Sequence, residues 1–156
     1  MNRLIRRLFL GDSTVISGDV VDLEERYRIS EQLAYDGIPA VYYDILKHGE
    51  RTTVGTLDIR LKRTDYSYYY GDIGYRVKSE YRGHHYAFYA CQIAFKEAKE
   101  HFGMSELIIT CNPDNIPSYK TLAALGGEYL GIEDVPADHE IYRHGDRQKC
   151  IFRYTL

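Results

Sequence analysis

The segment from Gly71 to Ala87 constrains the fold most, because it reads as a strand, a short turn and the start of a helix. The predicted helix covers residues 84–102. Its apolar stripe consists mainly of small side chains, namely Ala87, Ala90, Cys91, Ala94, Phe95 and Ala98. Small residues on that stripe predict that the helix packs closely against a sheet. The turn also holds an Arg-Gly pair and two successive histidines, which a simple chain reversal does not need.

The remaining periodicity predicts a mixed layer of strands and helices around this unit. Residues 23–35 have apolar positions at helical spacing and predict a surface helix. From residue 57 to residue 61, apolar and polar residues alternate, as in a half-buried strand. Strands are predicted at 4–10, 40–47, 52–62, 72–78, 106–111, 128–132 and 150–154, and a second helix ends at residue 125.

Composition limits the class of protein. Of the 156 residues, 44% are apolar and 28% are charged, which predicts one soluble globular domain spanning residues 1–156. No apolar run is long enough for a membrane span, and residues 1–10 lack the features of a signal peptide, so we expect a mature N-terminus and no membrane partner. The net charge of −3 argues against a nucleic-acid partner. Cys91, Cys111 and Cys150 lack metal-ligand spacing, so we expect reduced, buried thiols in a cytoplasmic protein without a metal site.

The turn at residues 82–87 has the features of an anion-binding helix start. The first amides of a helix have no partner within the helix, and the helix dipole adds positive charge there. Gly83 and Ala87 leave room for a phosphate, and Arg82 adds a cation with several donors. The alternative is a helix start with solvated polar residues. The sequence contains neither G-x-x-x-x-G-K-[ST] nor G-x-G-x-x-G, which excludes the other common phosphate loops.

This turn resembles the signature R/Q-x-x-G-x-G/A of the GNAT superfamily of acetyl-CoA-dependent N-acetyltransferases, and it stands here as Arg82-Gly83-His84-His85-Tyr86-Ala87. Residues 108–118, followed by Leu125-Gly126-Gly127, resemble the second half of the cofactor site of that family. The Gly-Gly ending and residues 151–154 are similar to a subgroup of predicted acetyltransferases without an assigned substrate. The resemblance extends over residues 38–156.

The resemblance implies an α/β fold with a mixed, mostly antiparallel central sheet and helices on both faces. It implies that acetyl-CoA is the cosubstrate and that a primary amine attacks the thioester directly, without a covalent enzyme intermediate. The amine acceptor is a small molecule or a peptide. The sequence does not decide whether the protein is a monomer or a homodimer. The cofactor-binding residues that the family pattern implies are Tyr75, Val77, Arg82, Gly83, His84, His85, Tyr86, Ala87, Asn115 and Ser118.

His85 stands where the family signature has its second glycine. Because a helical residue has a negative φ, we expect this position not to require glycine. The turn is then expected to bind the pyrophosphate through backbone amides, with the imidazole turned away or touching phosphate.

The resemblance also implies positions for proton transfer. Asp72, at the start of the central strand, is the candidate general base, and the alternative is a solvated aspartate at a strand end. Many family members have a tyrosine at the position of Leu122 as the acid that protonates the leaving thiolate. That departure leaves Ser118 or Tyr119 as the candidate acid. Ser118 is equally well explained as a helix cap.

Several other features have two interpretations. Asn115 contacts pantetheine or closes a turn, and Cys111 is expected to be inert packing rather than a nucleophile. The tyrosine-rich loop at residues 66–70 lines an acceptor pocket or covers a strand surface. Two functions without catalysis stay open, namely an acyl-CoA-binding regulatory module, which Leu122 favours, and a module whose tyrosines bind a sugar or an aromatic molecule.

Overall fold

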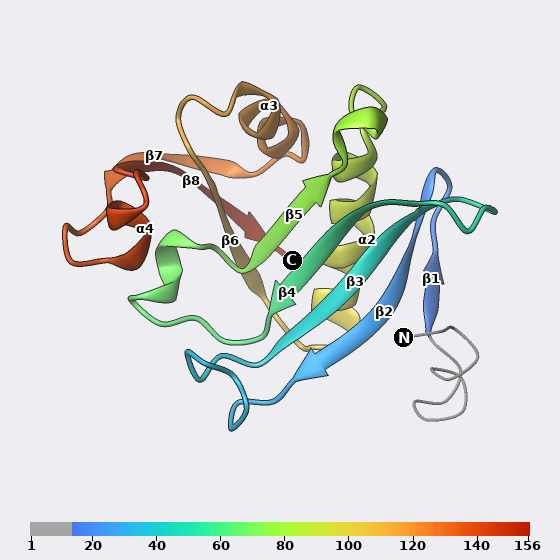
Figure 1. Ribbon diagram of the computed structural model, residues 1–156, viewed down its shortest axis with the longest axis horizontal. Coiled ribbons are helices and arrows are strands. Elements are labelled where there is room, and N and C mark those ends of the chain that lie inside the picture. The colour runs from blue at the N-terminus through green and yellow to red at the C-terminus, as the bar shows by residue number, and fades with distance from the viewer. Residues whose placement is uncertain (1–13) are drawn as a thin grey trace.

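The computed structural model describes residues 14–156 and contains two antiparallel sheets (Figure 1). The larger sheet has the strand order β1-β2-β3-β4-β5, and the smaller sheet has the order β6-β8-β7. The strands are β1 (Val15–Ser17), β2 (Val21–Ile29), β3 (Ala40–Lys47), β4 (Thr53–Arg60), β5 (Ile73–Val77), β6 (Glu106–Cys111), β7 (Glu128–Asp134) and β8 (Gln148–Thr155). The predicted α/β fold with mostly antiparallel strands is confirmed, although the strands form two antiparallel sheets instead of one mixed central sheet.

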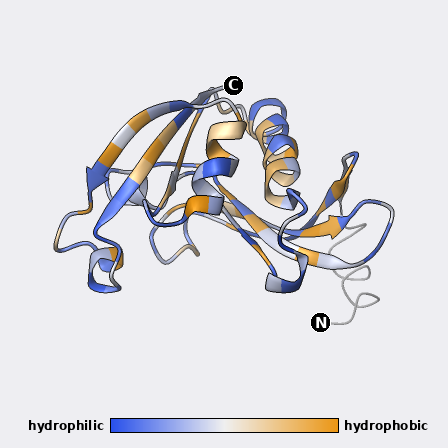
Figure 2. Ribbon diagram, turned by 90° about the horizontal axis from the view of Figure 1, so that it is seen from above, coloured by the Kyte–Doolittle hydropathy of each residue, from blue (hydrophilic) through white to orange (hydrophobic). Residues whose placement is uncertain are grey.

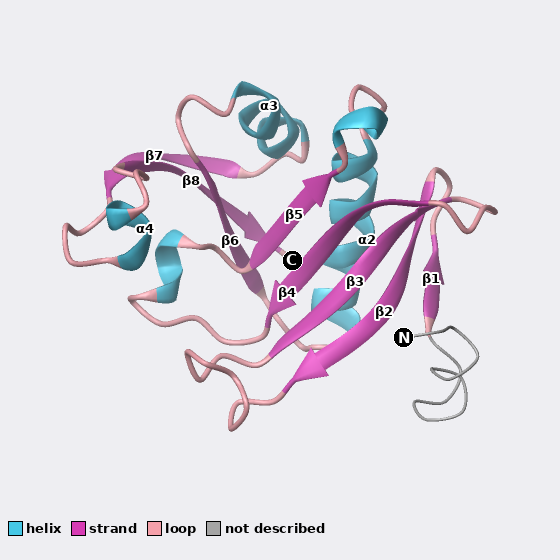
Figure 3. Ribbon diagram, in the orientation of Figure 1, coloured by secondary structure: helices cyan, strands magenta, loops and turns pink. Residues whose placement is uncertain are grey.

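The helical elements occupy the connections between strands (Figure 3). They are α2 (Tyr86–Glu100), α3 (Ile116–Ala124), α4 (Glu140–Arg143) and the single 3-10 turns η1 (Ser67–Tyr69) and η2 (Ser79–Tyr81). The strand, turn and helix predicted from Gly71 onward correspond to β5, η2 and α2. The short β1 and α4 had no signal in the sequence analysis.

One hydrophobic cluster joins both sheets to α2 and α3. Within the predicted small-residue stripe of α2, Ala90, Cys91, Ala94 and Ala98 have no exposed surface at all. Small side chains let the helix approach β2, β4 and β5 closely, and a tightly packed core excludes voids. Figure 2 shows the helix and strand layers from above, with hydrophilic and hydrophobic residues mixed along each element, as expected where one side is buried.

The two faces of the larger sheet differ. Tyr43, Leu57 and Ile59 belong to the core, on the side of α2. The residues next to them in sequence, such as Tyr42 and Asp58, point to the other face because side chains alternate along a strand. In Figure 1, α2 lies behind β2, β3 and β4, and no helix of residues 14–156 lies in front of these strands. We call this second side the open face of the larger sheet.

The predicted helix at residues 23–35 is wrong, because the segment forms most of β2 and the loop after it. β2 pairs with β3 from Val21 opposite Lys47 to Ile29 opposite Ala40. A β-bulge between Glu25 and Tyr27 shifts the alternation of side chains within the strand. Because of this shift the apolar residues of the strand do not alternate strictly with polar ones, and their spacing resembles that of an amphipathic helix. The predicted strand at residues 4–10 lies outside the described residues.

Candidate active site

The candidate site is built around β5 and β6, which belong to different sheets and meet at one point. The amide of Asp72 donates to the carbonyl oxygen of Ile108 (2.6 Å). Gly71 has φ +79°, and a Cβ there would lie 3.1 Å from the amide nitrogen of Thr110. Glycine therefore permits both the backbone turn and the close approach of β6. From this contact the two strands diverge toward the starts of α2 and α3 (Figure 1).

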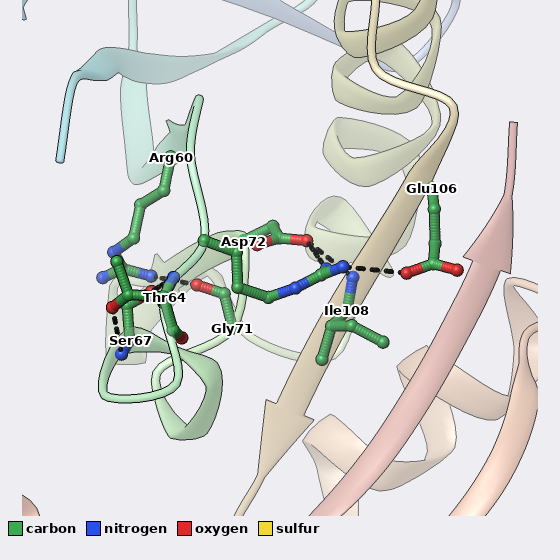
Figure 4. A network of polar contacts seen from close by, with 8 residues as sticks. Arg60, Thr64, Ser67, Gly71, Asp72, Glu106 and Ile108 are labelled. Atoms are coloured by element: carbon green, nitrogen blue, oxygen red, sulfur yellow. Dashed lines mark hydrogen bonds and ion pairs between the residues drawn. The ribbon is translucent and has the colours of Figure 1, made fainter.

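Asp72, the predicted general base, lies at this junction and is only 2% exposed. Its Oδ2 accepts hydrogen bonds from Arg63 Nη1 (2.6 Å) and from the amide of Ile108 (2.8 Å). The second arm of the Arg63 guanidinium donates to Glu106 (2.8 Å). Burial raises the pKa of Asp72, and the Ile108 amide and Arg63 oppose that shift. Figure 4 shows the network around Asp72, which joins the start of β5 to β6.

β5 is an edge strand, so one side of its backbone has no strand partner within residues 14–156. The amide of Arg60 donates to the carbonyl of Asp72 (2.7 Å), and every second residue of β5 from there bonds to β4. Tyr75 and Val77 fall between these positions and direct their backbone groups away from β4. The carbonyl of Val77 accepts a hydrogen bond from Arg82 Nε (3.2 Å).

The start of α2 is open and its backbone is strained. Residues 82–85 are exposed, and no described side chain caps the helix at His85. The amides of Tyr86 and Ala87, in the first turn, have no acceptor within the helix. Gly83 has φ +89°, and space surrounds it on the side where a Cβ would be. Backbone donors therefore face a space that small residues keep clear, as the sequence predicts for an anion site.

His85 has φ +60° and ψ +24°, and it is the only non-glycine residue with a positive φ in residues 14–156. The expectation of a negative φ at this position is therefore wrong. His85 is the N-cap residue, where the chain turns before the helix begins, rather than a residue within the helix. The left-handed conformation costs about 1 kcal/mol for a residue with a Cβ. Glycine, the residue of the resembled signature, adopts this conformation without that cost.

Two hydroxyl groups meet across the divergence of β5 and β6. The hydroxyl oxygens of Tyr75, from β5, and Ser118, from α3, are 2.7 Å apart. Asn115 is the N-cap of α3, and its side chain accepts a hydrogen bond from the amide of Ser118 (3.3 Å). The capping role thus belongs to Asn115, and the Ser118 hydroxyl is left for Tyr75. Burial raises the pKa of Tyr75, so this phenol keeps its proton at neutral pH.

The other two positions considered for the acid lie in packed surroundings. Tyr119 makes edge contacts with the rings of Tyr129 and Phe152, at centroid distances of 5.6 and 5.4 Å. Leu122 is completely buried in the core, and its carbonyl accepts a hydrogen bond from Tyr154 (2.6 Å). The side chain of Tyr119 therefore contacts β7 and β8, whereas that of Ser118 contacts β5.

All three cysteines are free thiols and buried, as expected. Cys111 lies opposite Cys150 in the pairing of β6 with β8. Burial raises the pKa of Cys111 to about 11, so the group is a neutral thiol at physiological pH. Burial likewise raises the pKa of Cys91 to about 12. These properties agree with the interpretation of Cys111 as packing.

The tyrosine-rich loop contacts the segment around α4. His139 is 2% exposed, its ring stacks on Tyr66 at 4.0 Å, and its Nε2 lies 2.7 Å from the Tyr66 carbonyl oxygen. The amide of Ile141 donates to His139 Nδ1 (3.2 Å), which leaves Nε2 as the donor to Tyr66. The hydroxyl of Tyr70 donates to Glu140 (2.8 Å). The loop thus links the start of β5 to the connection between β7 and β8.

Three groups of this arrangement had no signal in the sequence, namely Arg63, the hydroxyl of Tyr75 and His139. Each acts on a partner 9 to 73 residues away in the chain. A lone arginine or histidine in a loop has no local signal of that kind. In the part of the chain that the structure describes, no group of three or more His, Cys, Asp or Glu side chains could hold a metal ion. No described helix has the length and apolar character needed to span a membrane.

A known family model matches most of the sequence of this chain. The model of the family described as acetyltransferase (GNAT) domain matches residues 12–128, which include β5, the exposed turn, α2 and the Ser118 region. No curated protein matches the sequence.

Solved structures with similar folds are distant in sequence. Ribosomal-protein-S5-alanine acetyltransferase from Vibrio fischeri is 20% identical, with a TM-score of 0.58 over 74% of this chain and 61% of that chain. The microcin C7 self-immunity acetyltransferase MccE, solved with acetyl-CoA and AMP, is 18% identical, with a TM-score of 0.57 over 75% and 61%. A GNAT-family protein from Chromobacterium violaceum is 14% identical, with a TM-score of 0.65 over 92% and 87%. The matched part of this chain covers about three fifths of the length of the first two proteins. At these sequence identities the similarity shows the fold alone.

Proposed function

This chain belongs to the GNAT acetyltransferase family, and we propose that it transfers an acetyl group from acetyl-CoA to a primary amine by direct attack of the amine. The observation that carries the proposal is the exposed, uncapped start of α2 beside the free edge of β5. Acetyl-CoA supplies an activated acyl group on a thiol leaving group. The residues of this chain have to bind that molecule, orient it and move protons.

The start of α2 fits the pyrophosphate of acetyl-CoA. The amides of Tyr86 and Ala87 provide hydrogen-bond donors at the positive end of the helix dipole. Gly83 leaves the approach open, and the Arg82 guanidinium uses Nε on Val77, which leaves its two terminal nitrogens for phosphate. His84 and His85 are exposed at the same turn. These residues are proposed to hold the phosphates through backbone and guanidinium donors.

The free edge of β5 fits the amide-containing arm of acetyl-CoA. Tyr75 and Val77 present outward backbone groups, which can pair with the amides of the arm as a neighbouring strand does. Asn115 is occupied as the cap of α3, so its proposed part in the site is to position Ser118. This pairing would direct the reactive end of the arm along β5 toward Tyr75 and Ser118.

The Tyr75–Ser118 pair is proposed to protonate the departing thiolate. Two hydroxyl groups carry two protons, and the hydrogen bond between them uses only one. The remaining proton is available to a third group, and burial keeps Tyr75 protonated. Ser118, on the rigid first turn of α3, is the member proposed to face the sulfur. Tyr119 packs against β7 and β8 instead, so we propose a supporting role for it.

Asp72 is proposed to position the site rather than to remove the proton from the amine. Its Oδ2 is already engaged by Arg63 and by the Ile108 amide, and only 2% of the residue is exposed. These contacts fix the point from which β5 and β6 diverge. A carboxylate in this arrangement is poorly placed to meet a substrate amine directly.

The test is binding and turnover with a panel of acceptors. Acetyl-CoA at about a hundredfold its dissociation constant should stabilise the fold by roughly 2.7 kcal/mol. Thiol release should then depend on an added amine. Because the similar proteins include one named for a ribosomal-protein alanine and one solved with AMP, the panel should contain peptide α-amines, a lysine side chain and small amines.

The outcomes separate the candidate functions. Binding without thiol release for every amine would favour the acyl-CoA-binding regulatory module. A melting temperature unchanged by millimolar acetyl-CoA would contradict the proposal altogether. Ser118→Ala and Tyr75→Phe should lower the rate of thiol release without changing the affinity for acetyl-CoA.

A further inference from the structure

A carboxylate on the open face of the larger sheet lacks a full set of partners. Asp58, on β4, lies between Tyr42 on β3 and Gly74 on β5. Its side chain is 19% exposed, and within residues 14–156 its buried Oδ2 accepts no hydrogen bond. Buried polar atoms are almost always satisfied, so an unsatisfied carboxylate oxygen requires an explanation.

Gly74 gives Asp58 access to β5. A Cβ at position 74 would lie 2.7 Å from Asp58 Oδ1, so the carboxylate occupies the space above the backbone of β5 that any other side chain would fill. The next residue, Tyr75, directs its backbone to the free edge. A molecule paired with that edge would lie one strand spacing away, about 4.8 Å. This spacing exceeds a hydrogen-bond distance, so a proton on a substrate there would reach Asp58 through one water molecule.

The surroundings of Asp58 leave it able to accept a cation. Arg60 Nη2 lies 3.5 Å from Oδ2 without making a hydrogen bond, because the guanidinium is held elsewhere. Its Nη1 donates to the Gly71 carbonyl (2.8 Å), and its charge lies over the Tyr70 ring at 5.6 Å. Burial raises the pKa of Asp58, and Arg60 opposes that shift. A carboxylate with a raised pKa is a better proton acceptor than an exposed one.

Aromatic rings adjoin the carboxylate on the β3 side. Tyr42, opposite Asp58 in register, stacks on Tyr27 with ring centroids 4.6 Å apart. A carboxylate beside an aromatic face suits an alkylammonium group, which offers charge, three donors and an apolar stem. The titratable and charged groups on the strands around Asp58 are Arg60 on β4, Tyr42 and Asp44 on β3, Tyr27 on β2 and, flanking Gly74 along the chain, Asp72 and Arg76.

We propose that Asp58 receives the alkylammonium group of the acceptor on the open face of the larger sheet and removes its proton. The inference rests on the proposed acetyl transfer and names its acceptor class, a cationic primary alkylamine. One proton passes from the ammonium nitrogen through one water molecule to an Asp58 oxygen, and the neutral amine attacks. The nitrogen–carbon bond forms as the carbon–sulfur bond breaks, and the thiolate takes a proton from the Tyr75–Ser118 pair. The new amide nitrogen still carries an extra proton, which passes through water to restore the proton of that pair. Asp58 then returns its proton to water.

The experiment compares amines that differ in charge. Butylamine, tyramine and spermidine carry ammonium groups at pH 7, whereas methoxyamine is neutral. Thiol release with each is measured from pH 5 to pH 9 for the wild type, for Asp58→Asn and for the control Thr56→Val. Thr56 is exposed on the same face of β4, two residues before Asp58. Acetyl-CoA affinity is measured calorimetrically for all three proteins.

The expected result is selective. Asp58→Asn should lower kcat/KM for the best alkylamine by about a hundredfold or more, and the rate should then rise with pH as the free amine becomes abundant. Its rate with methoxyamine should change by less than about threefold, and Thr56→Val should resemble the wild type. Equal losses with both kinds of amine, no loss with either, or a wild type that binds acetyl-CoA but acetylates no alkylamine would each overturn the proposal. A wild type that does not bind acetyl-CoA would instead refute the proposed function.

Discussion

The two ends of β5 use their polar groups in opposite ways. At the N-terminal end, Asp72 is buried and bonded to Arg63 and to the Ile108 amide. Beyond the C-terminal end, residues 82–85 are exposed, and no described side chain caps the first turn of α2. His85 is held there in a left-handed conformation. The polar groups at the first end are hydrogen-bonded within the protein, whereas the amides at the second end have no described side-chain acceptor.

This difference indicates that the start of β5 serves the stability of the fold and that the start of α2 serves ligand binding. Satisfied, buried contacts at the start of β5 fix the positions of two sheets relative to each other. The exposed amides at the start of α2 have no acceptor within the helix and are available to a ligand, and the strained residue beside them lowers stability. We therefore expect loss of a contact at the first end to alter the free energy of unfolding, and a change that blocks the amides at the second end to alter ligand binding.

The largest effect is expected from Ala87→Glu. A methylene group and a carboxylate would stand in the first turn of α2, where phosphate has to approach. Acetyl-CoA affinity should fall by more than about a hundredfold, or roughly 2.7 kcal/mol. An acidic residue is favourable at a helix N-terminus, so the fold should be retained. Calorimetric titration measures the loss, and Gln92→Glu, which adds charge at an exposed position farther along α2, serves as control. Undiminished binding by Ala87→Glu would exclude the amide site.

At the satisfied end, Arg63→Met should destabilise the fold. The change leaves the Asp72 carboxylate buried without its cation, and because Arg63 is 30% exposed we expect a cost of about 2 kcal/mol. The matched control is Lys62→Met, whose ion pair with Glu31 is more than half exposed on both sides and should contribute less than about 0.5 kcal/mol. Urea unfolding with a constant m-value measures both. Equal losses would show that the Arg63–Asp72 pair has no special role.

His85→Gly should stabilise the protein slightly. Relief of the left-handed conformation is worth about 1 kcal/mol, and the added freedom of the unfolded chain offsets about half of it. The adjacent His84 has no positive φ, so His84→Gly should lose about 0.5 to 1 kcal/mol. Acetyl-CoA affinity should change by less than about tenfold for His85→Gly. If both variants lose stability equally, the imidazole of His85 supports the turn.

Asp58→Asn should be stabilising by about 1 kcal/mol at pH 7, because an unsatisfied buried carboxylate is replaced by a neutral group. Since burial raises the pKa of Asp58 in the folded state, this carboxyl favours folding when protonated and loses that contribution as pH rises through its raised pKa. The advantage of the variant should therefore grow as pH rises above 3.8, the ordinary value for aspartate. Thermal unfolding at pH 3.5, 5 and 7 measures it. An advantage independent of pH would mean that Asp58 is not ionised at neutral pH.

Much of the candidate site could be predicted from local sequence. The strand at 106–111 coincides with β6, that at 40–47 with β3, and the turn at residues 82–87 is exposed at the start of α2. The prediction failed at β2, where a bulge disturbed the alternation, and at His85, whose conformation depends on the chain turn before the helix. Asp72 was correctly placed at the start of its strand, but its burial and its pairing with Arg63 had no local signal.

Most of the elements and the family could be predicted from the sequence alone, because periodicity, glycines and the turn motif act over a few residues. Which side chains contact one another depends on the tertiary structure. Tyr75 and Ser118 are 43 residues apart and share a hydrogen bond because β5 and α3 face each other across the divergence of the sheets. Asp58 overlies Gly74 because of the register between β4 and β5. Hydrogen bonding and burial depend on positions in space, and these follow from strand register and helix packing rather than from neighbours in the chain.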